Sequence, residues 1–251
     1  MLDFAPRQPW PAEFPDVIIH TTVKLRDAVP EYAAAKSGDA DAALTLAIRL
    51  LDDDAVARID QLVLGLDVAL VPVVADETLG FNAIPDAMAQ VLGWMRGFAV
   101  VSGGIVQTNK VGHTRAPSFQ RLVTPAEFDG PVDAGRNYLL VDDHVGLGGT
   151  LANLRGYIEG RGGAVIAMTT LTESRNARTI RLQEATRAML WEKHGKTLDQ
   201  LWQNRLGYGI DCLTDIEASN LARQPSVAAI EDFLAQAAVE ARGRGLEPAV
   251  G

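Results

Sequence analysis

Residues 137–151 read Asn-Tyr-Leu-Leu-Val-Asp-Asp-His-Val-Gly-Leu-Gly-Gly-Thr-Leu, and this stretch decides the fold. An apolar run at 138–141 ends in two consecutive acids, and a glycine-rich turn then leads to Thr150 at the start of an amphipathic segment. A buried strand that passes through a tight turn into a helix is the unit from which α/β sheets are built. Ligands bind at the carboxyl ends of the strands in such sheets, so the turn is where a site is expected.

The segments around this stretch alternate between short apolar runs and helical periodicity. Strands are predicted at 67–74, 98–101, 138–141 and 164–171, and helices between them at 84–95 and 151–158. Strands that alternate with helices are joined by right-handed crossovers and form parallel sheets. We therefore predict an α/β fold, a mostly parallel, twisted sheet with helices on both faces.

The rest of the chain divides into an N-terminal arm and helix (1–59), the core (60–175) and a C-terminal helical extension (176–251), together one compact unit. The Pro-rich arm between Pro6 and Pro15 is predicted to be extended. A helix capped by Ser37 or Asp39 should break at the acidic run 52–54, because negative charge is unfavourable at a helix C-terminus. Helices are also predicted at 180–194, after the capping box 214–217, and at 227–238.

Composition excludes several classes of function. The net charge of −9 and pI near 4.9 argue against a nucleic-acid surface, which needs clustered Lys and Arg. No apolar run approaches the roughly 20 residues of a membrane span, and the N-terminus does not resemble a signal peptide. Cys212 is the one cysteine, so an intrachain disulfide is excluded. A cytoplasmic protein with no membrane and no nucleic-acid partner is expected.

The stretch 102–136, between the second and third predicted strands, is unusually long for a connection. Thr124 and Glu127 have capping-box spacing around Pro125, which predicts a short helical turn there. The stretch also carries Lys110, His113, Arg115 and Arg121, a run of cations in an acidic chain.

The turn after the two acids has the features of a phosphate site. Glycines at 146, 148 and 149 allow positive φ angles and close approach of backbone N–H groups to an anion. The helix that follows adds unpaired N–H donors and a favourable dipole, and Thr150 adds a hydroxyl. Asp142 and Asp143 would repel a bare anion, but each carboxylate can accept a hydrogen bond from a ribose hydroxyl. A ligand shaped like ribose 5-phosphate fits both features.

Other phosphate-binding motifs fit the turn less well. A Walker A loop needs a Lys directly after its glycines, and none is present. A dinucleotide-binding fingerprint needs a third Gly where Leu151 stands, and it does not place acids before the glycines.

The stretch 139–151 resembles the signature of type I phosphoribosyltransferases, and the resemblance extends over about 60–175. It implies that the chain binds 5-phosphoribosyl-1-pyrophosphate (PRPP) and transfers the phosphoribosyl group to a small-molecule acceptor with release of pyrophosphate. Asp142 and Asp143 would bind the ribose hydroxyls and Mg²⁺. The 5-phosphate would be held by Val145, Gly146, Leu147, Gly148, Gly149 and Thr150. The pyrophosphate loop would comprise Ala75, Asp76, Glu77 and Thr78.

The resemblance also assigns roles outside the turn. The stretch 102–136 would be the mobile catalytic loop, with Lys110 and Arg115 as catalytic cations that neutralise the leaving pyrophosphate. The acceptor would be chosen by a hood from the N-terminal segment or from the helices after Thr172. Dimers are common in the family, which makes a homodimer plausible.

Three departures from the family leave an alternative open. Gly146 stands where many members have Thr or an acid, His144 replaces an aliphatic residue and is a base candidate, and Asp76 and Glu77 replace a basic residue in the pyrophosphate loop. The alternative is a non-catalytic regulatory protein of the same fold that senses PRPP or a nucleotide.

Overall fold

The computed structural model of the protein describes residues 7–77, 80–109, 118–246 and 248, and its centre is a five-stranded parallel sheet. The strand order is β1-β9-β8-β2-β5, and every pairing among the described residues of this sheet is parallel. The strands are β1 (Ile18–Ile19), β2 (Val68–Pro72), β5 (Ala99–Val100), β8 (Asn137–Val145) and β9 (Ala164–Glu173). The four predicted strands are confirmed. The edge strand β1 comes from the N-terminal segment and was not predicted.

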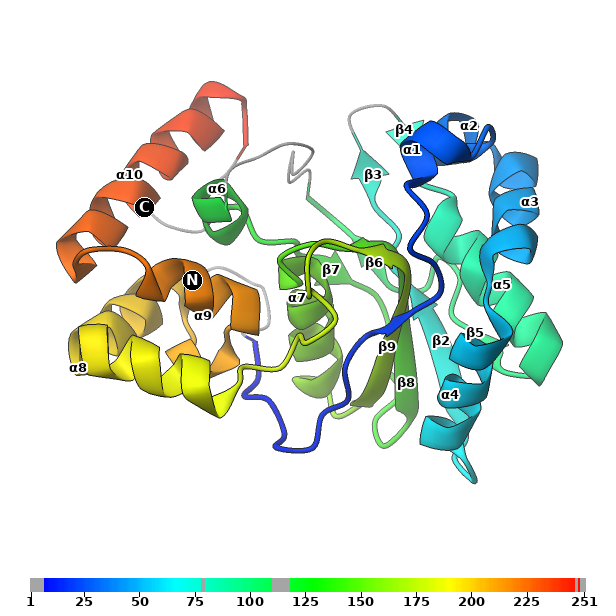
Figure 1. Cartoon of the computed structure of the whole chain (residues 1–251), viewed down its shortest axis with the longest axis horizontal. Helices are drawn as coiled ribbons and strands as arrows, with labels where there is room; N and C mark the ends of the chain where they lie inside the picture. The colour runs from blue at the N-terminus through cyan, green and yellow to red at the C-terminus, as the bar shows by residue number, and fades with distance from the viewer. Residues whose placement is uncertain (1–6, 78–79, 110–117, 247, 249–251) are drawn as a thin grey trace.

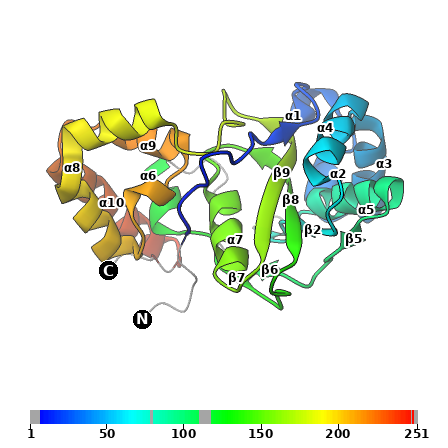
Figure 2. The same ribbon diagram turned by 90° about the horizontal axis from the view of Figure 1, so that it is seen from below.

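Helices cover both faces of the sheet, as predicted (Figures 1 and 2). Side chains alternate along β8. Leu139 and Val141 pack with α3 (Ala40–Leu50), α4 (Asp53–Val63) and α5 (Ile84–Arg96), whereas Tyr138 and Leu140 pack with α7 (Gly149–Glu159) on the opposite face. Burial on both faces explains the continuous apolar run in β8.

The acidic run 52–54 separates two helices. Asp39 caps α3 by accepting a hydrogen bond from the Ala42 amide (2.9 Å), and α3 ends at Leu50, as predicted. Asp52 then caps α4 in the same way through the Ala55 amide (2.9 Å), which places Asp53 and Asp54 in the first turn of α4. Negative charge is favourable at that end of a helix, so the run that closes one helix stabilises the start of the next.

The C-terminal helices form a second cluster beyond α7, at the left of Figure 1. They are α8 (Glu184–Leu206), α9 (Asp215–Ala222) and α10 (Val227–Gly243), and they pack around Trp202 together with α6 (Ser118–Val123). The predicted capping box is confirmed, because Thr214 and Glu217 exchange side-chain-to-backbone hydrogen bonds at 3.0 and 3.2 Å. Cys212 is a buried free thiol in this cluster.

The long stretch 102–136 contains regular structure. A two-stranded antiparallel sheet pairs β6 (Val106–Gln107) with β7 (Phe128–Asp129), and α6 lies between them in sequence. The predicted helical turn at 124–127 is wrong, because no helix forms between the end of α6 and the start of β7. The side chain of Asn109 bonds the Pro125 carbonyl (2.7 Å) and the Glu127 amide (2.9 Å), which holds the segment alongside the chain before α6. Lys110, His113 and Arg115 lie outside the described residues.

The N-terminal arm connects the two ends of the molecule in both ribbon views (Figures 1 and 2). Its described part has no regular helix or strand before β1, as predicted. Arg155 of α7 donates hydrogen bonds to the carbonyls of Gln8 (3.0 Å) and Pro9 (2.7 Å), and Trp10 donates one to the Leu213 carbonyl (2.8 Å). The arm is therefore fixed to both α7 and the C-terminal cluster.

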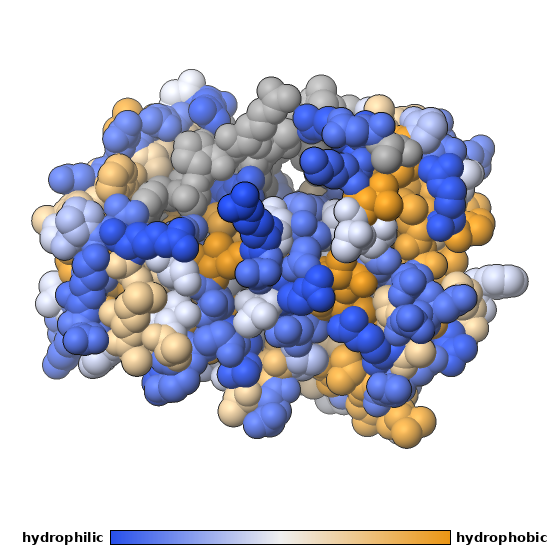
Figure 3. All heavy atoms as spheres, in the orientation of Figure 1, coloured by the Kyte–Doolittle hydropathy of each residue, from blue (hydrophilic) through white to orange (hydrophobic). Residues whose placement is uncertain are grey.

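Polar side chains cover the middle of the face shown in Figure 3, and exposed hydrophobic ones gather toward its lower right, around the end of α4. Leu62, Leu64 and Leu66 belong to that exposed set. None of the helices in the described part of the chain is long and apolar enough to cross a bilayer.

Candidate functional site

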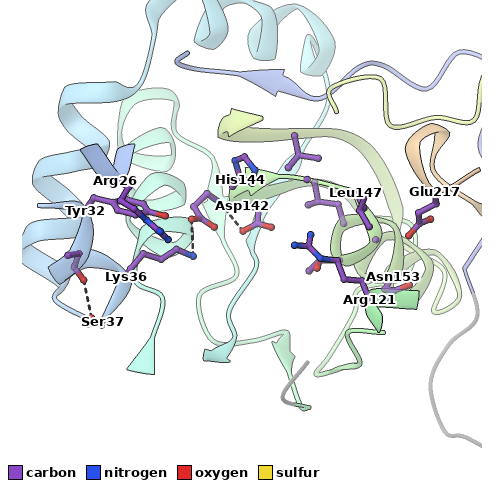
Figure 4. Close-up of a pocket in the computed structure, with 18 residues that line it drawn as sticks. Arg26, Tyr32, Lys36, Ser37, Arg121, Asp142, His144, Leu147, Asn153 and Glu217 are labelled. Carbon is purple, nitrogen blue, oxygen red and sulfur yellow. Dashed lines mark hydrogen bonds and ion pairs between the residues drawn. The ribbon is translucent and has the colours of Figure 1, made fainter. Parts of the chain in front are cut away.

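A cavity of about 480 Å³ lies at the carboxyl end of β8 (Figure 4). One part of its lining is the stretch 142–151 with Asn153. The rest comes from the two short N-terminal helices α1 (Leu25–Ala28) and α2 (Tyr32–Lys36), from Arg121 of α6, and from Glu217 of α9. All eight residues predicted to bind ribose 5-phosphate therefore line one cavity, together with walls from both ends of the chain.

The turn between β8 and α7 has one glycine in the left-handed region. Gly148 has φ 81°, whereas Gly146 and Gly149 have negative φ, so the prediction of positive φ angles applies to Gly148 alone. Gly149 is required for close approach, since a Cβ there would lie 2.9 Å from Oε1 of Glu217. The first hydrogen bond of α7 runs from the Ala152 amide to the Gly148 carbonyl (2.9 Å). The amides of the first turn of α7 therefore have no acceptor within the helix.

Asp142 and Asp143 lie on the floor of the cavity and are buried (8% and 5% exposed). The strand predicted to end at residue 141 continues to Val145, so both acids belong to β8. Oδ2 of Asp143 lies 3.0 Å from Nζ of Lys36, and its Oδ1 accepts a hydrogen bond from Asn82 (3.2 Å). Oδ1 of Asp142 accepts one from the Asp143 amide (2.8 Å).

Burial raises the pKa of Asp142 well above its usual value, and the neighbouring charge of Asp143 raises it further. Lys36 opposes this shift but does not cancel it. Two adjacent buried carboxylates thus favour a state with a single negative charge, and Lys36 neutralises that charge. A ligand that donates hydroxyls to both carboxylates, or that brings a cation, favours full ionisation.

His144 is held at the rim by two hydroxyls. Its Nδ1 lies 2.8 Å from Thr172 Oγ1 and its Nε2 lies 3.0 Å from Ser174 Oγ. Burial lowers the pKa of the imidazole, so the ring is neutral at physiological pH. Both ring nitrogens have hydroxyl partners, which orients the ring.

Arg121 and Glu217 complete the wall at the glycine turn. A guanidinium nitrogen of Arg121 lies 3.2 Å from the point that a Cβ at Gly146 would occupy, so this cation packs directly on the turn. The carboxylate of Glu217 is paired with Arg7 at 2.5 and 3.0 Å, and Arg7 also bonds Asn153 (2.5 Å). Arg7 therefore neutralises Glu217, and Arg121 adds a positive charge beside the turn.

The predicted pyrophosphate loop forms a small hairpin after β2. The backbone of β3 (Asp76–Glu77) pairs in antiparallel register with β4 (Gly80–Phe81), and Ala75 precedes the hairpin. Thr78 lies outside the described residues, as do Lys110 and Arg115. Among the side chains described around this hairpin, Asn82 reaches the site through its bond to Asp143.

Sequence reasoning missed several residues of the cavity. Arg26, Tyr32, Lys36 and Ser37 come from the N-terminal helices, and their position depends on a chain path that local periodicity does not reveal. Asn153 follows Thr150 by one helical turn, and that spacing would have placed it on the same face of α7. Within the described part of the chain, no group of three or more His, Cys, Asp and Glu side chains could hold a metal ion.

Two curated proteins are similar to this chain. Protein TraN of Escherichia coli is 43% identical over 240 residues, which cover 96% of this chain and 53% of TraN. An uncharacterised protein of Haemophilus influenzae is 42% identical over 154 residues, which cover 61% of this chain and 34% of that protein. The chain spans about half or less of the length of these relatives. No protein-family model matches it.

Among solved structures, an adenine phosphoribosyltransferase shares 12% identity over 56% of this chain and 73% of its own, with a TM-score of 0.34. UMP synthase of Leishmania donovani shares 15% identity over 78% of this chain and 33% of its own, with a TM-score of 0.32.

Proposed function

We propose that the cavity binds PRPP and that the chain transfers the phosphoribosyl group to a small-molecule acceptor with release of pyrophosphate. The observation that carries this proposal is the meeting, in one cavity of about 480 Å³, of the two buried aspartates and the start of α7. A phosphate cradle and a pair of diol acceptors that share a cavity match the two ends of a ribose 5-phosphate group.

Each part of the cavity has a role in this proposal. The amides at the start of α7, with Arg121 beside Gly146, would hold the 5-phosphate. Asp142 and Asp143 would accept hydrogen bonds from the ribose hydroxyls. Mg²⁺ prefers oxygen ligands and one or two carboxylates together with substrate phosphates, so these aspartates fit it when substrate supplies the other oxygens. There it would neutralise charge on the pyrophosphate.

The transfer breaks the bond between C1 of the ribose and a pyrophosphate oxygen, and the bonding electrons leave with pyrophosphate. A new bond forms between C1 and a nucleophilic atom of the acceptor, whose proton is lost to solvent. Positive charge develops on the ribose in the transition state, and the carboxylates beneath it stabilise that charge electrostatically. Catalysis by this chain would consist of positioning and charge stabilisation, with no general base from His144.

The test is to incubate the full chain with PRPP, Mg²⁺ and a panel of purine, pyrimidine and other nitrogen acceptors while pyrophosphate release is measured. Acceptor-dependent release supports the transferase. The matched control is the Asp142→Asn, Asp143→Asn double variant, which should release none. Absence of PRPP binding to the wild-type chain by calorimetry would refute the whole proposal.

A second candidate is a sensor that binds PRPP or a nucleotide without turnover. The specific observation in its favour is the turn after β2, which carries Asp76 and Glu77 where pyrophosphate binding would call for a basic residue. The same experiment separates the candidates, because a sensor binds PRPP in calorimetry but releases pyrophosphate with none of the acceptors.

A further inference from the structure

The wall of the cavity opposite the glycine turn carries a second group of cations. Figure 4 shows Arg26 and Lys36 on one side of the aspartates and Arg121 on the other. Arg26 belongs to α1 and Lys36 to α2, and Tyr32 lies between them on the same wall. In a chain of net charge −9, the cavity thus has two cationic walls with two carboxylates between them.

This arrangement matches a ligand with two separate anionic groups. The turn that would face pyrophosphate by resemblance contains no Lys or Arg between residues 73 and 83 and carries Asp76 and Glu77. A diphosphate bound above the aspartates therefore needs its neutralising side chains from another element. Among the described residues of the cavity lining, Arg26 and Lys36 are the cations that lie away from the glycine turn.

We propose that the α1–α2 pair binds the pyrophosphate group of PRPP, with Lys36 transferring from Asp143 to the diphosphate when the ribose hydroxyls bind Asp143. This inference rests on the proposed function and assigns a binding residue that lies outside the segment resembling the family.

The exchange of partners is energetically feasible. The Lys36 side chain is 25% exposed, so the ammonium keeps solvent contact and only the carboxylate of the pair is buried. Breaking the pair leaves Asp143 with Asn82 and the incoming hydroxyls, so the buried carboxylate stays hydrogen-bonded. The ammonium gains a partner with more negative charge than a carboxylate, and a Lys on a flexible stem can follow it.

Calorimetry of the full chain with Mg²⁺ and two probes, PRPP and ribose 5-phosphate, tests the assignment. Lys36→Gln should weaken PRPP binding about tenfold, and adding Arg26→Gln should weaken it further, since each variant removes a charge-assisted contact. The affinity for ribose 5-phosphate, which lacks the diphosphate, should be unchanged or slightly increased. Lys196→Gln on the exposed surface of α8 removes the same charge far from the cavity and should change neither affinity.

The outcomes are distinguishable. Equal weakening of both probes by Lys36→Gln, in a variant whose thermal unfolding matches wild type, would overturn the assignment of Lys36 and leave the proposed function standing. Unchanged PRPP affinity would overturn it as well. A wild-type chain that binds neither probe would refute the proposed function itself, and this inference with it.

Discussion

The guanidinium of Arg7 donates hydrogen bonds to both carboxylate oxygens of Glu217, at 2.5 and 3.0 Å, although 210 residues separate the two in sequence. Glu217 is also the N3 residue in the capping box of α9, and the hydroxyl of Thr214 in that box donates to the Leu147 carbonyl in the glycine turn (2.6 Å). The pair therefore joins the N-terminal arm, the C-terminal cluster and the glycine turn at one buried point.

Arg7→Met should destabilise the fold by roughly 3–5 kcal/mol, because it leaves the Glu217 carboxylate buried without its cation. Burial is the largest single influence on the pKa of Arg7 and lowers it, but the charge and hydrogen bonds of Glu217, together with Tyr208 and Cys212, outweigh burial and raise that pKa. The measurement is urea unfolding. Arg187→Met, which removes a cation from the exposed pair with Glu184, is the matched control and should cost less than about 1 kcal/mol. Equal losses in the two variants would contradict this account.

Asp142→Asn should stabilise the ligand-free fold at neutral pH by an amount on the order of 1 kcal/mol. The pKa of Asp142 is raised by burial and by Asp143. Folding favours the protonated form of such a group. Its contribution to stability is therefore complete below the unfolded pKa and is lost as pH rises through the folded pKa. Asn keeps the acceptor for the Asp143 amide and does not ionise. Thermal unfolding from pH 5 to 8 should show a flatter profile for the variant than for wild type, and an unchanged slope would contradict the assignment.

The contribution of His20 to the stability of the fold should change with pH in the direction opposite to that of Asp142. Burial lowers the pKa of His20 to about 4, and the neutral ring accepts from the Asp52 amide (3.1 Å) and contacts Thr169 (3.0 Å). The unfolded chain takes up the proton near pH 6.5, so stability should fall as pH drops from about 6.5 to about 4, by on the order of 2–3 kcal/mol. His20→Gln should remove most of this slope in acid unfolding curves. A slope retained in full would mean that other groups titrate in this range.

The Asp142→Asn, Asp143→Asn double variant should lose PRPP binding while the fold survives. Each carboxylate would accept a charge-assisted hydrogen bond from the ribose, and such bonds contribute about 1.5–3 kcal/mol apiece. Asp133→Asn alters an exposed pair with Arg136 and serves as the control for the loss of an acid. Titration calorimetry measures the change. If the double variant bound PRPP with wild-type affinity, the assignment of the ribose hydroxyls to these aspartates would be refuted.

Gly148→Ala should destabilise the protein more than Gly65→Ala does. Both glycines have left-handed φ angles, 81° and 76°, so the backbone strain of the substitution is similar. A Cβ at Gly148 would lie 3.0 Å from Ile180 and 3.1 Å from Thr214, whereas nothing lies within 4 Å of one at Gly65. We expect a cost of about 1 kcal/mol at Gly65 and 1–3 kcal/mol more at Gly148. Similar unfolding midpoints for the two variants would show that Ile180 and Thr214 can move away from the added methyl group at little cost.

Local pattern was enough to predict the sheet and the turn. The alternation of apolar runs with helical periodicity locates β2, β8, β9, α5 and α7, and Asp39 and the capping box at Thr214 mark true helix starts. These features depend on residues a few positions apart, which is the range over which propensity and capping act.

Features that depend on distant contacts were missed. Pro125 suggested a helix start, but Asn109 bonds the Pro125 carbonyl and the Glu127 amide from 16 and 18 positions away, and no helix forms there. Strand β1 and the cavity wall at Lys36 depend on how the arm and the N-terminal helices pack against β9 and β8. Local sequence pattern does not reveal such packing, so the cationic wall of the cavity with Arg26 and Lys36 was not predicted.

The wall formed by α9 has a consequence for the order of events during translation. Helix α2 and strand β8 leave the ribosome well before Thr214 and Glu217, so the first turn of α7 is synthesised with one side still open to water. The contacts of Thr214 with the turn and of Glu217 with Arg7 can form only after α9 has been synthesised. The wall of the proposed binding cavity should therefore be completed late in folding, once α9 and the segment around Arg7 have come together.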